Sequence, residues 1–147
     1  MSEPLNLGDS AITAATAAAG TVITSGVDET GAATAYLSGL GDILSALLSV
    51  NFVYGAGGTS VKVIIENSID QGTSWIEVYR AAFTTASGQR LVNLSALTAM
   101  ATPYTPAALT DDTAKDGIIG DRWRAKYISV GTYSGNTSVS VRMQPKE

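Results

Sequence analysis

Apolar and polar residues alternate at every second position in several parts of the chain, a period typical of β-strands with one buried face. In residues 44–54 (LSALLSVNFVY), the apolar Leu48, Val50 and Phe52 fall on one side of the expected strand. A glycine-rich segment at 55–59 follows, and glycine readily adopts the positive φ angles that tight turns need. We therefore expect the chain to reverse there and to form a hairpin with a second strand.

Two further strands are expected within VKVIIENSIDQGTSWIEVYRAAF, residues 61–83. The alternation on either side of a polar turn at 70–73 predicts a hairpin, and Gly72 allows the reversal without strain. With the strand before them, these strands would form a meander of three. A last hairpin is predicted from residues 122–130, a glycine-containing turn, and residues 137–143.

The first 31 residues have a different character, since they are rich in Ala, Thr and Gly. Residues 11–19 fit a helix by propensity, whereas their threonines and the β-branched run at 21–24 favour extended chain. We expect an extended N-terminal arm over residues 1–31 and a single β-sandwich domain over residues 32–147. One domain is the usual solution near this length.

The whole pattern predicts an all-β protein, an antiparallel β-sandwich of roughly seven or eight short strands without intervening helices. One long stretch, Ser95 to Gly120, shows no strand pattern and contains Pro103 and Pro106. Loops of this length inside a compact domain are often functional surfaces. We therefore expect this loop, including Tyr104, and the N-terminal arm to contact partners.

Composition narrows the possible functions. Only 15% of the residues are charged, and all nine basic residues lie at or after Lys62, which leaves the first part of an already acidic chain without any. Nucleic-acid binding is disfavoured, because it needs clustered Lys and Arg in a favourable field. No stretch approaches the roughly 20 apolar residues that cross a bilayer, so no membrane partner is expected.

The chain contains no histidine and no cysteine, which removes the most common general base, metal ligand and strong nucleophile. Glu66 and Glu77 flank one predicted turn and could support glycoside hydrolysis if they were suitably spaced. Such pairs are ordinary on a sheet face, where basic neighbours neutralise them. We expect no catalytic residue, no cofactor and no enzymatic activity.

The acidic segment DDTAKDGIIGD, residues 111–121, is the densest group of oxygen ligands. Counted from Asp111, a helix-loop-helix calcium site needs Gly at the sixth position, but Asp116 stands there and Gly117 follows. The register fails. The interpretation we favour is a turn whose Asp side chains cap backbone amides, and no metal is expected.

A basic stripe is predicted near the end of the chain. Arg122, Arg124 and Lys126 share one face of a strand, and Arg142 on the expected partner strand could join them. The stripe could form a small patch for an acidic partner. Alternatively, its members form cross-strand ion pairs with carboxylates such as Glu66, which is the interpretation we favour.

Aromatic residues offer one further alternative. Trp75 and Trp123 lie on alternating strands, where packing in the core is the favoured interpretation. Together with Tyr104 and Tyr133 they could instead form a carbohydrate-binding platform.

The sequence also resembles a known family, over about Leu44 to Met143. The motifs S-x-D-x-G-T-S/T-W-I (Ser68 to Ile76), F-T-T-A-S (Phe83 to Ser87) and D-G-I-x-G-D-R (Asp116 to Arg122) are similar to those of small structural proteins encoded by tailed bacteriophages and prophages. These motifs describe turns and strands, and none is catalytic. Gln71 replaces the second glycine of the family's turn.

The resemblance implies a jelly-roll sandwich in the virion, made in the host cytoplasm. It implies a decoration or cement protein on the capsid exterior, which bridges and stabilises subunits of the major capsid protein. We expect a homo-oligomer, either a dimer or a trimer, because such proteins act within symmetric assemblies. The alternative is a tail, baseplate or head-fibre component with a role in adsorption or carbohydrate binding.

Overall fold

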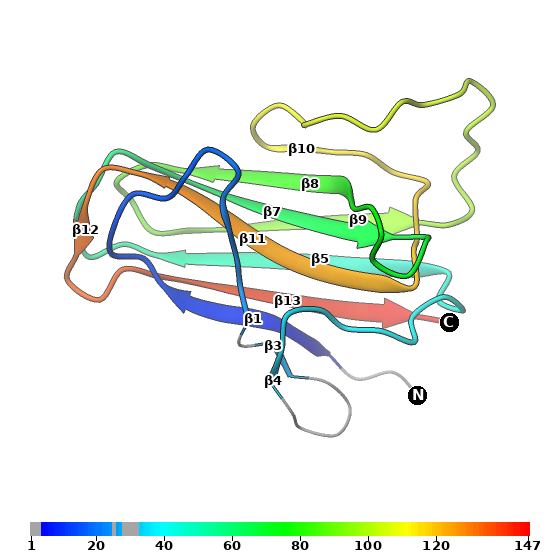
Figure 1. Cartoon of the computed structure of the whole chain (residues 1–147), viewed down its shortest axis with the longest axis horizontal. Coiled ribbons are helices and arrows are strands. Elements are labelled where there is room, and N and C mark those ends of the chain that lie inside the picture. Colours follow the sequence, from blue (N-terminus) through cyan, green and yellow to red (C-terminus); the bar gives the residue numbers. More distant parts are fainter. Residues whose placement is uncertain (1–3, 25, 28–32) are drawn as a thin grey trace.

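The protein is built from β-strands joined by turns and loops, as the computed structural model shows for residues 4–24, 26–27 and 33–147 (Figure 1). In chain order the strands are β1 (Leu5–Ala11), β2 (Thr21–Val22), β3 (Gly26–Val27), β4 (Ala33–Thr34), β5 (Ser45–Val53), β6 (Ala56–Gly57), β7 (Ser60–Ser68), β8 (Ile76–Phe83), β9 (Gly88–Ser95), β10 (Thr113–Ala114), β11 (Arg122–Val130), β12 (Tyr133–Ser134) and β13 (Ser138–Lys146). No helix occurs in these residues. The predicted all-β class is confirmed.

Two antiparallel sheets pack against each other to form the sandwich. The six-stranded sheet has the order β4-β3-β1-β13-β5-β9, and the five-stranded sheet has the order β10-β8-β7-β11-β2. A small third sheet pairs β12 with β6 at one end of the molecule. The predicted antiparallel sandwich is therefore confirmed as well.

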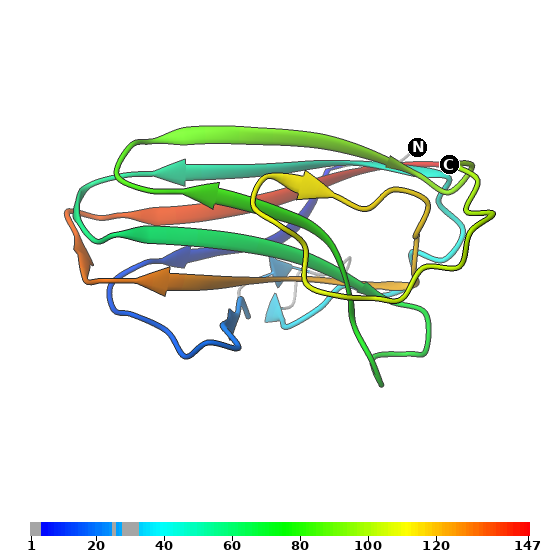
Figure 2. The same ribbon diagram turned by 90° about the horizontal axis from the view of Figure 1, so that it is seen from above.

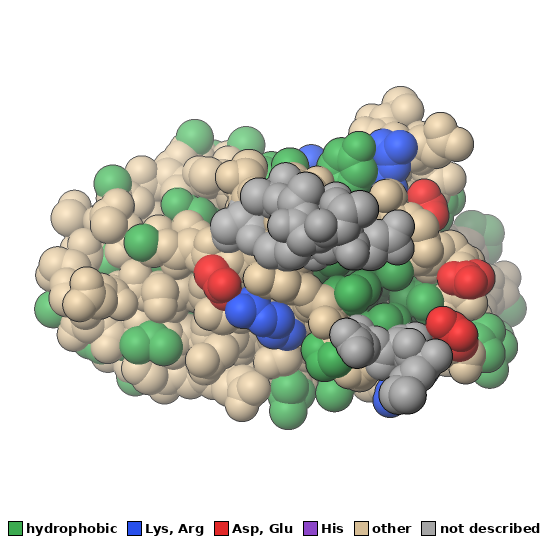
Figure 3. All heavy atoms as spheres, turned by 90° about the horizontal axis from the view of Figure 1, so that it is seen from below, with side chains coloured by type: hydrophobic (Ala, Val, Ile, Leu, Met, Phe, Trp, Pro, Cys, Tyr) green, Lys and Arg blue, Asp and Glu red, His purple; other side chains and the backbone are tan. Residues whose placement is uncertain are grey.

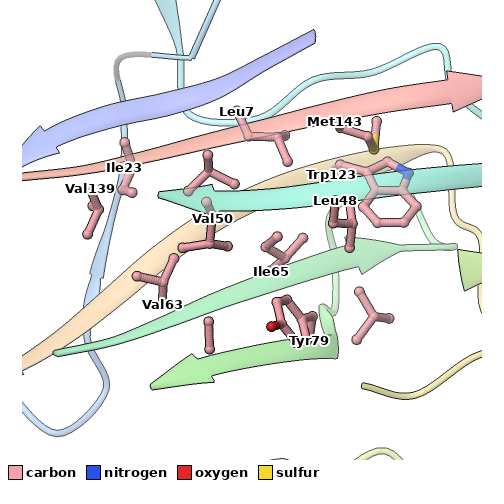
Figure 4. Packing of buried hydrophobic residues seen from close by; sticks show 14 of the residues in the cluster. Leu7, Ile23, Leu48, Val50, Val63, Ile65, Tyr79, Trp123, Val139 and Met143 are labelled. Carbon is pink, nitrogen blue, oxygen red and sulfur yellow. The ribbon is translucent and has the colours of Figure 1, made fainter. Parts of the chain in front are cut away.

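The core forms because alternate residues of the long strands face the space between the sheets. Along β5 every second residue is buried, and Val50 points toward Val63 and Ile65 of β7 (Figure 4). Trp123 of β11 is fully buried near Met143 of β13. Each such side chain contributes about 1.5–3 kcal/mol when fully buried, so this interior provides most of the stability of a chain without disulfides.

Two of the three predicted hairpins are wrong. The hairpin of β7 and β8 is confirmed, but β5 and β7 lie in different sheets, and so do β11 and β13. The expected meander is therefore wrong too. The connections cross from one sheet to the other, and their short strands β6 and β12 pair there. Gly55 fits this crossing because a side chain on it would overlap the backbone of Gly135.

A separate N-terminal arm is not confirmed. β1 pairs with β13 from Leu5 opposite Met143 to Ala11 opposite Ser138. Leu7, Ile12 and Ile23 belong to the same buried cluster as the rest of the sandwich. The segment between β1 and β2 is not helical, but it is an irregular loop with a turn closed by Gly20 N–H on Ala17 O rather than extended chain. Residues 1–3, 25 and 28–31 of the expected arm, and residue 32, lie outside the described residues.

Candidate interaction surface

The predicted basic stripe of Arg122, Arg124 and Lys126 lies on the outer face of the five-stranded sheet, and a single carboxylate neutralises two of its members. Register places Arg124 opposite Glu66 and Lys126 opposite Ile64. The Glu66 carboxylate, which is almost fully buried, accepts a hydrogen bond from Arg124 Nε at 2.9 Å and pairs with Lys126 Nζ at 3.4 Å. The interpretation as cross-strand ion pairs is thus confirmed for these two residues.

A β-bulge creates a second ion pair on this face. The pairing of β7 with β8 passes from Ile65–Tyr79 to Glu66–Glu77, so Val78 is the extra residue. The bulge brings Glu77 to the same side as Arg80, although simple alternation separates them. Arg80 donates two hydrogen bonds to the carboxylate of Glu77, both at 2.9 Å, and this bonding raises the pKa of Arg80.

Arg122 and Arg124 also stack on aromatic rings. The Arg122 guanidinium lies 4.8 Å from the centre of the Tyr36 ring, and that of Arg124 lies 4.2 Å from the Trp75 ring. The two rings are themselves 6.2 Å apart. Each guanidinium therefore covers one face of its ring.

The turn between β7 and β8 is held by Asp70. Its carboxylate accepts hydrogen bonds from the Ser74 hydroxyl, the Ser74 N–H and the Ser68 hydroxyl. These bonds lower the pKa of Asp70 to about 2. Gln71, which stands where the resembled family has glycine, adopts φ of 60°, a region that costs a non-glycine residue free energy.

Arg142 does not join the basic stripe, so that prediction is wrong. It lies on β13 in the other sheet, where Nη1 donates to Asp9 at 2.9 Å and to Asn6 at 2.8 Å. Hydrogen bonding to Arg142 lowers the pKa of Asp9. Alternation places Arg142 on an outer face correctly but cannot say which sheet carries its strand.

The acidic segment 111–121 caps backbone amides, as interpreted. Asp116 accepts hydrogen bonds from the N–H groups of Ser95 and Gly117, and Asp112 accepts one from Ala82 N–H. Burial alone would raise the pKa of Asp116, but the hydrogen bonds that its carboxylate accepts have the larger combined effect and lower the pKa. In the described part of the chain, no three acidic residues converge as a cation site.

The loop from residue 96 to 121 projects beside β8 and covers part of the charged face (Figures 1 and 2). It is attached through Glu77, which accepts a hydrogen bond from Leu109 N–H at 2.7 Å. β10 within the loop pairs with β8 at Thr113 and Ala114. The expected absence of strand pattern therefore holds apart from these two residues.

An apolar pocket of about 380 Å³ lies beneath this loop. Tyr104 and Pro106, two of the predicted contact residues, line it, whereas Pro103 is exposed and is not part of the lining. The remaining lining residues are Ile69, Ile76, Met100, Gly117, Ile118 and Ile119. Lys115 Nζ lies 4.5 Å from the centre of the Tyr104 ring and fixes it.

Met100 belongs to the loop that was expected to contact partners, whereas Ile69 is a contact candidate that the sequence did not indicate. Ile69 is 70% exposed and Met100 is 38% exposed, although both line the pocket. Ile69 sits in a turn motif that was interpreted only as a turn. The sequence feature that could have indicated Ile69 as a contact residue is its apolar side chain inside an otherwise polar turn.

The β5–β9 part of the outer face of the six-stranded sheet carries no charged side chain, whereas β1 and β13 carry the Asp9–Arg142 pair. The outward residues of β5 and β9 are Ser45, Leu47, Ser49, Asn51, Val53, Gln89, Leu91 and Asn93. From the side of β1 and β13, Figure 3 shows a basic group beside an acidic one, with mainly uncharged surface to their left. Leu47, Val53 and Leu91 are 41%, 47% and 60% exposed.

The alternative carbohydrate platform is not assembled. Trp123 is fully buried and donates its ring N–H to Gly120 O, and Tyr133 is also buried, with its hydroxyl bonded to Thr84 O. Trp123 is thus confirmed as a core residue, whereas Trp75 is half-buried beneath Arg124.

Comparison with known proteins adds no relative: no protein-family model matches the chain, and a search of curated proteins finds no match. The described residues include no helix that is long and apolar enough to cross a membrane. The resemblance to phage structural proteins therefore rests on its three motifs and stays a prediction, as does the absence of enzymatic activity.

Proposed function

We propose that the protein is a virion structural protein that decorates the exterior of a phage capsid and bridges subunits of the major capsid protein. The observation that carries the proposal is the apolar pocket with the exposed Ile69 and Met100 at its margin. Large apolar side chains that stand in solvent beside an apolar pocket mark a surface suited to burial against another protein.

The way in which the loop is held supports this role. Asp116 and Glu77 fix its backbone through the hydrogen bonds from Ser95 N–H and Leu109 N–H. A contact surface that is already ordered loses less entropy on binding. The major capsid protein would place an apolar side chain in the pocket and cover Ile69.

The order of the strands supports the jelly-roll expectation. When β1, β2, β5, β7, β8, β9, β11 and β13 are numbered along the chain, one sheet places the first, eighth, third and sixth side by side. The other sheet places the fifth, fourth, seventh and second together. This is the arrangement of two interleaved Greek keys, and viral capsid domains are among the proteins that use it.

Co-sedimentation with assembled capsid shells that lack the protein tests the proposal. Ile69→Asp should weaken binding by roughly tenfold or more, because a carboxylate would be buried without a partner. Val130→Asp is the matched control, since Val130 is 50% exposed at the far end of β11. Failure of the wild-type chain to bind shells, or equal binding by both variants, would overturn the proposal.

The tail, baseplate or head-fibre alternative predicts a different position on the particle. Immunogold labelling of intact virions separates the two, because a decoration protein labels the head surface evenly. Labelling confined to the tail would replace the capsid proposal with this alternative.

A further inference from the structure

The four edges of the two main sheets are formed by strands of different length. Three end in strands of only two residues, β4, β10 and β2, whereas the fourth ends in β9, which is eight residues long (Figure 2). Proteins usually shield sheet edges with very short strands, lysines, prolines or bulges. β9 contains no lysine or proline, and its pairing with β5 shows no bulge.

The backbone of β9 leaves hydrogen-bonding groups unused. Ala96 N–H donates to Leu44 O, whereas Ser95 N–H points the other way and donates to Asp116. Because the direction alternates along an antiparallel strand, Leu91 and Asn93 direct their N–H and C=O groups away from β5. Nothing in the described chain pairs with these groups.

The side chains beside this edge carry no uncompensated charge. Leu91 is 60% exposed, with Gln89 and Asn93 on either side of it on the same outer face. The one charged residue of β9, Arg90, bonds to Asp112 at 3.2 Å and lies over the Phe83 ring. Two copies of this edge can therefore approach each other without repulsion between like charges.

A pocket of about 370 Å³ keeps the first half of the strand accessible. Its lining includes Gly88, Arg90, Phe83 and Asp112. The pocket separates this half of β9 from Ala82 and Phe83 of β8. The long loop contacts β9 at two points, where Arg90 bonds to Asp112 and Ser95 N–H bonds to Asp116. Between these two contacts, the outward backbone groups of Leu91 and Asn93 remain open in the described chain.

We propose that two copies of the chain pair through β9, antiparallel, about a two-fold axis that relates their Leu91 residues. In this register the two Leu91 side chains meet, and Gln89 of each copy faces Asn93 of the other. Gln89 donates to Ser49 at 3.1 Å, which leaves its carbonyl oxygen to accept from the Asn93 amide. The two six-stranded sheets then form one continuous sheet across the dimer.

A second copy is the occupant because the edge is complementary to itself. An isologous contact requires each residue to face an acceptable partner under the two-fold operation. Leucine on leucine and amide on amide satisfy this condition, whereas the alternative register that places Leu91 opposite Asn93 does not. The inference goes beyond the proposed function and holds wherever the protein acts.

Sedimentation-velocity measurements on the purified chain test the pairing. A contact dominated by one strand pair lies at the low end of interface sizes, so protein concentrations from about 10 μM to about 1 mM should be covered. Leu91→Lys and Leu91→Glu should each raise the dimer dissociation constant by roughly tenfold or more, because like charges would meet. An equimolar mixture of the two variants should restore the dimer. Leu47→Lys is the matched control, because Leu47 is 41% exposed on the same face but one strand away from the edge.

A cysteine cross-link provides a second measurement. The native chain has no cysteine, and paired residues in this register have Cα atoms about 5.5 Å apart, within disulfide range. Leu91→Cys should give a covalent dimer on mild oxidation, and Leu47→Cys should not.

Wild-type chain that stays monomeric over the whole concentration range would overturn the inference. So would equal behaviour of the Leu91 and Leu47 variants, or a mixture of the lysine and glutamate variants that stays monomeric. Loss of the dimer with retained binding to shells would leave the proposed function intact. Loss of shell binding in Ile69→Asp with a retained dimer would show that the dimer forms independently of the contact with the capsid.

Discussion

The outer face of the five-stranded sheet and the β5–β9 part of the six-stranded sheet use their polar residues in opposite ways. On the five-stranded sheet, Glu66 and Glu77 bind Arg124, Lys126 and Arg80, and the long loop covers part of the face. On the six-stranded sheet, the outward positions of β5 and β9 hold serine, amide and aliphatic side chains without charge.

The contrast shows that charged side chains of this protein mainly form ion pairs with one another. A basic stripe in the sequence looks like a binding patch, but its carboxylate partners lie on the neighbouring strand. Interfaces between proteins are depleted of charge at their centres. The uncharged β5–β9 part of the six-stranded sheet, with its unpaired edge, is therefore better suited to pairing with a second copy than the charged face is.

The largest expected effect is at Glu66. Glu66→Gln leaves Arg124 and Lys126, which are largely buried, without a carboxylate. The free energy of unfolding should fall by about 3 kcal/mol, as for other broken buried pairs. Urea denaturation measures it, with Asn51→Ser on the uncharged face as a control that should change by less than about 0.5 kcal/mol. A loss below about 1 kcal/mol in Glu66→Gln would contradict the contrast between the faces.

Glu77 should show a smaller loss of stability with a local signature. Glu77→Gln weakens both the Arg80 bonds and the attachment of Leu109, and we expect a loss of about 2 kcal/mol. Limited proteolysis should cut the loop several-fold faster in this variant. Glu66→Gln serves as the control, since it should not accelerate cleavage in the loop beyond its effect on global stability.

Acid stability should depend on Asp70. Its pKa is about 2 in the folded chain against an ordinary value of 3.8, so its contribution is complete above the higher value and is lost as the pH falls toward the lower. Between about pH 5 and about pH 2.5, Asp70→Asn should lose less stability than the wild type. Urea midpoints at the two pH values measure this. Asp9→Asn on the other sheet should change in the same direction, because hydrogen bonding to Arg142 lowers the pKa of Asp9. An unchanged acid loss in Asp70→Asn would show that the turn is not responsible.

The smallest effect is expected at the exposed pair of Lys62 and Asp111. Their atoms are 2.9 Å apart, but the side chains are 34% and 51% exposed. Asp111→Asn should change the free energy of unfolding by about 0.5 kcal/mol or less, because solvent screens such pairs. A loss as large as that of Glu66→Gln would mean that burial does not rank the ion pairs on this face.

Much of the local structure was predictable. The strands over 44–54 and 61–83 appear where alternation placed them, and the hairpin of β7 and β8 forms at its polar turn. The capping role of the acidic segment followed from the chemistry of Asp side chains. The bulge at Val78 was not predictable, because one extra residue fits the alternation of either face equally well.

The candidate surface was predicted only in part. Tyr104 and Pro106 were expected in a contact region because the loop has no strand pattern, and they do line the pocket. Met100 comes from the same loop, whereas Ile69 and Ile76 complete the pocket from the turn between β7 and β8 and the start of β8. Only the folded chain brings the β7–β8 turn to the long loop.

The sequence by itself determined the all-β class, the positions of β5, β7, β8, β11 and β13, and the buried side of these strands apart from the bulge in β8. Only the tertiary structure decided which strands share a sheet. It placed β1 beside β13 in the sandwich, and it placed Arg142 and Arg124 in different sheets. The physical reason is that alternation reports the burial of a strand's faces, which is the same for any neighbour. The choice of neighbour depends on packing between sheets, which a local pattern does not encode.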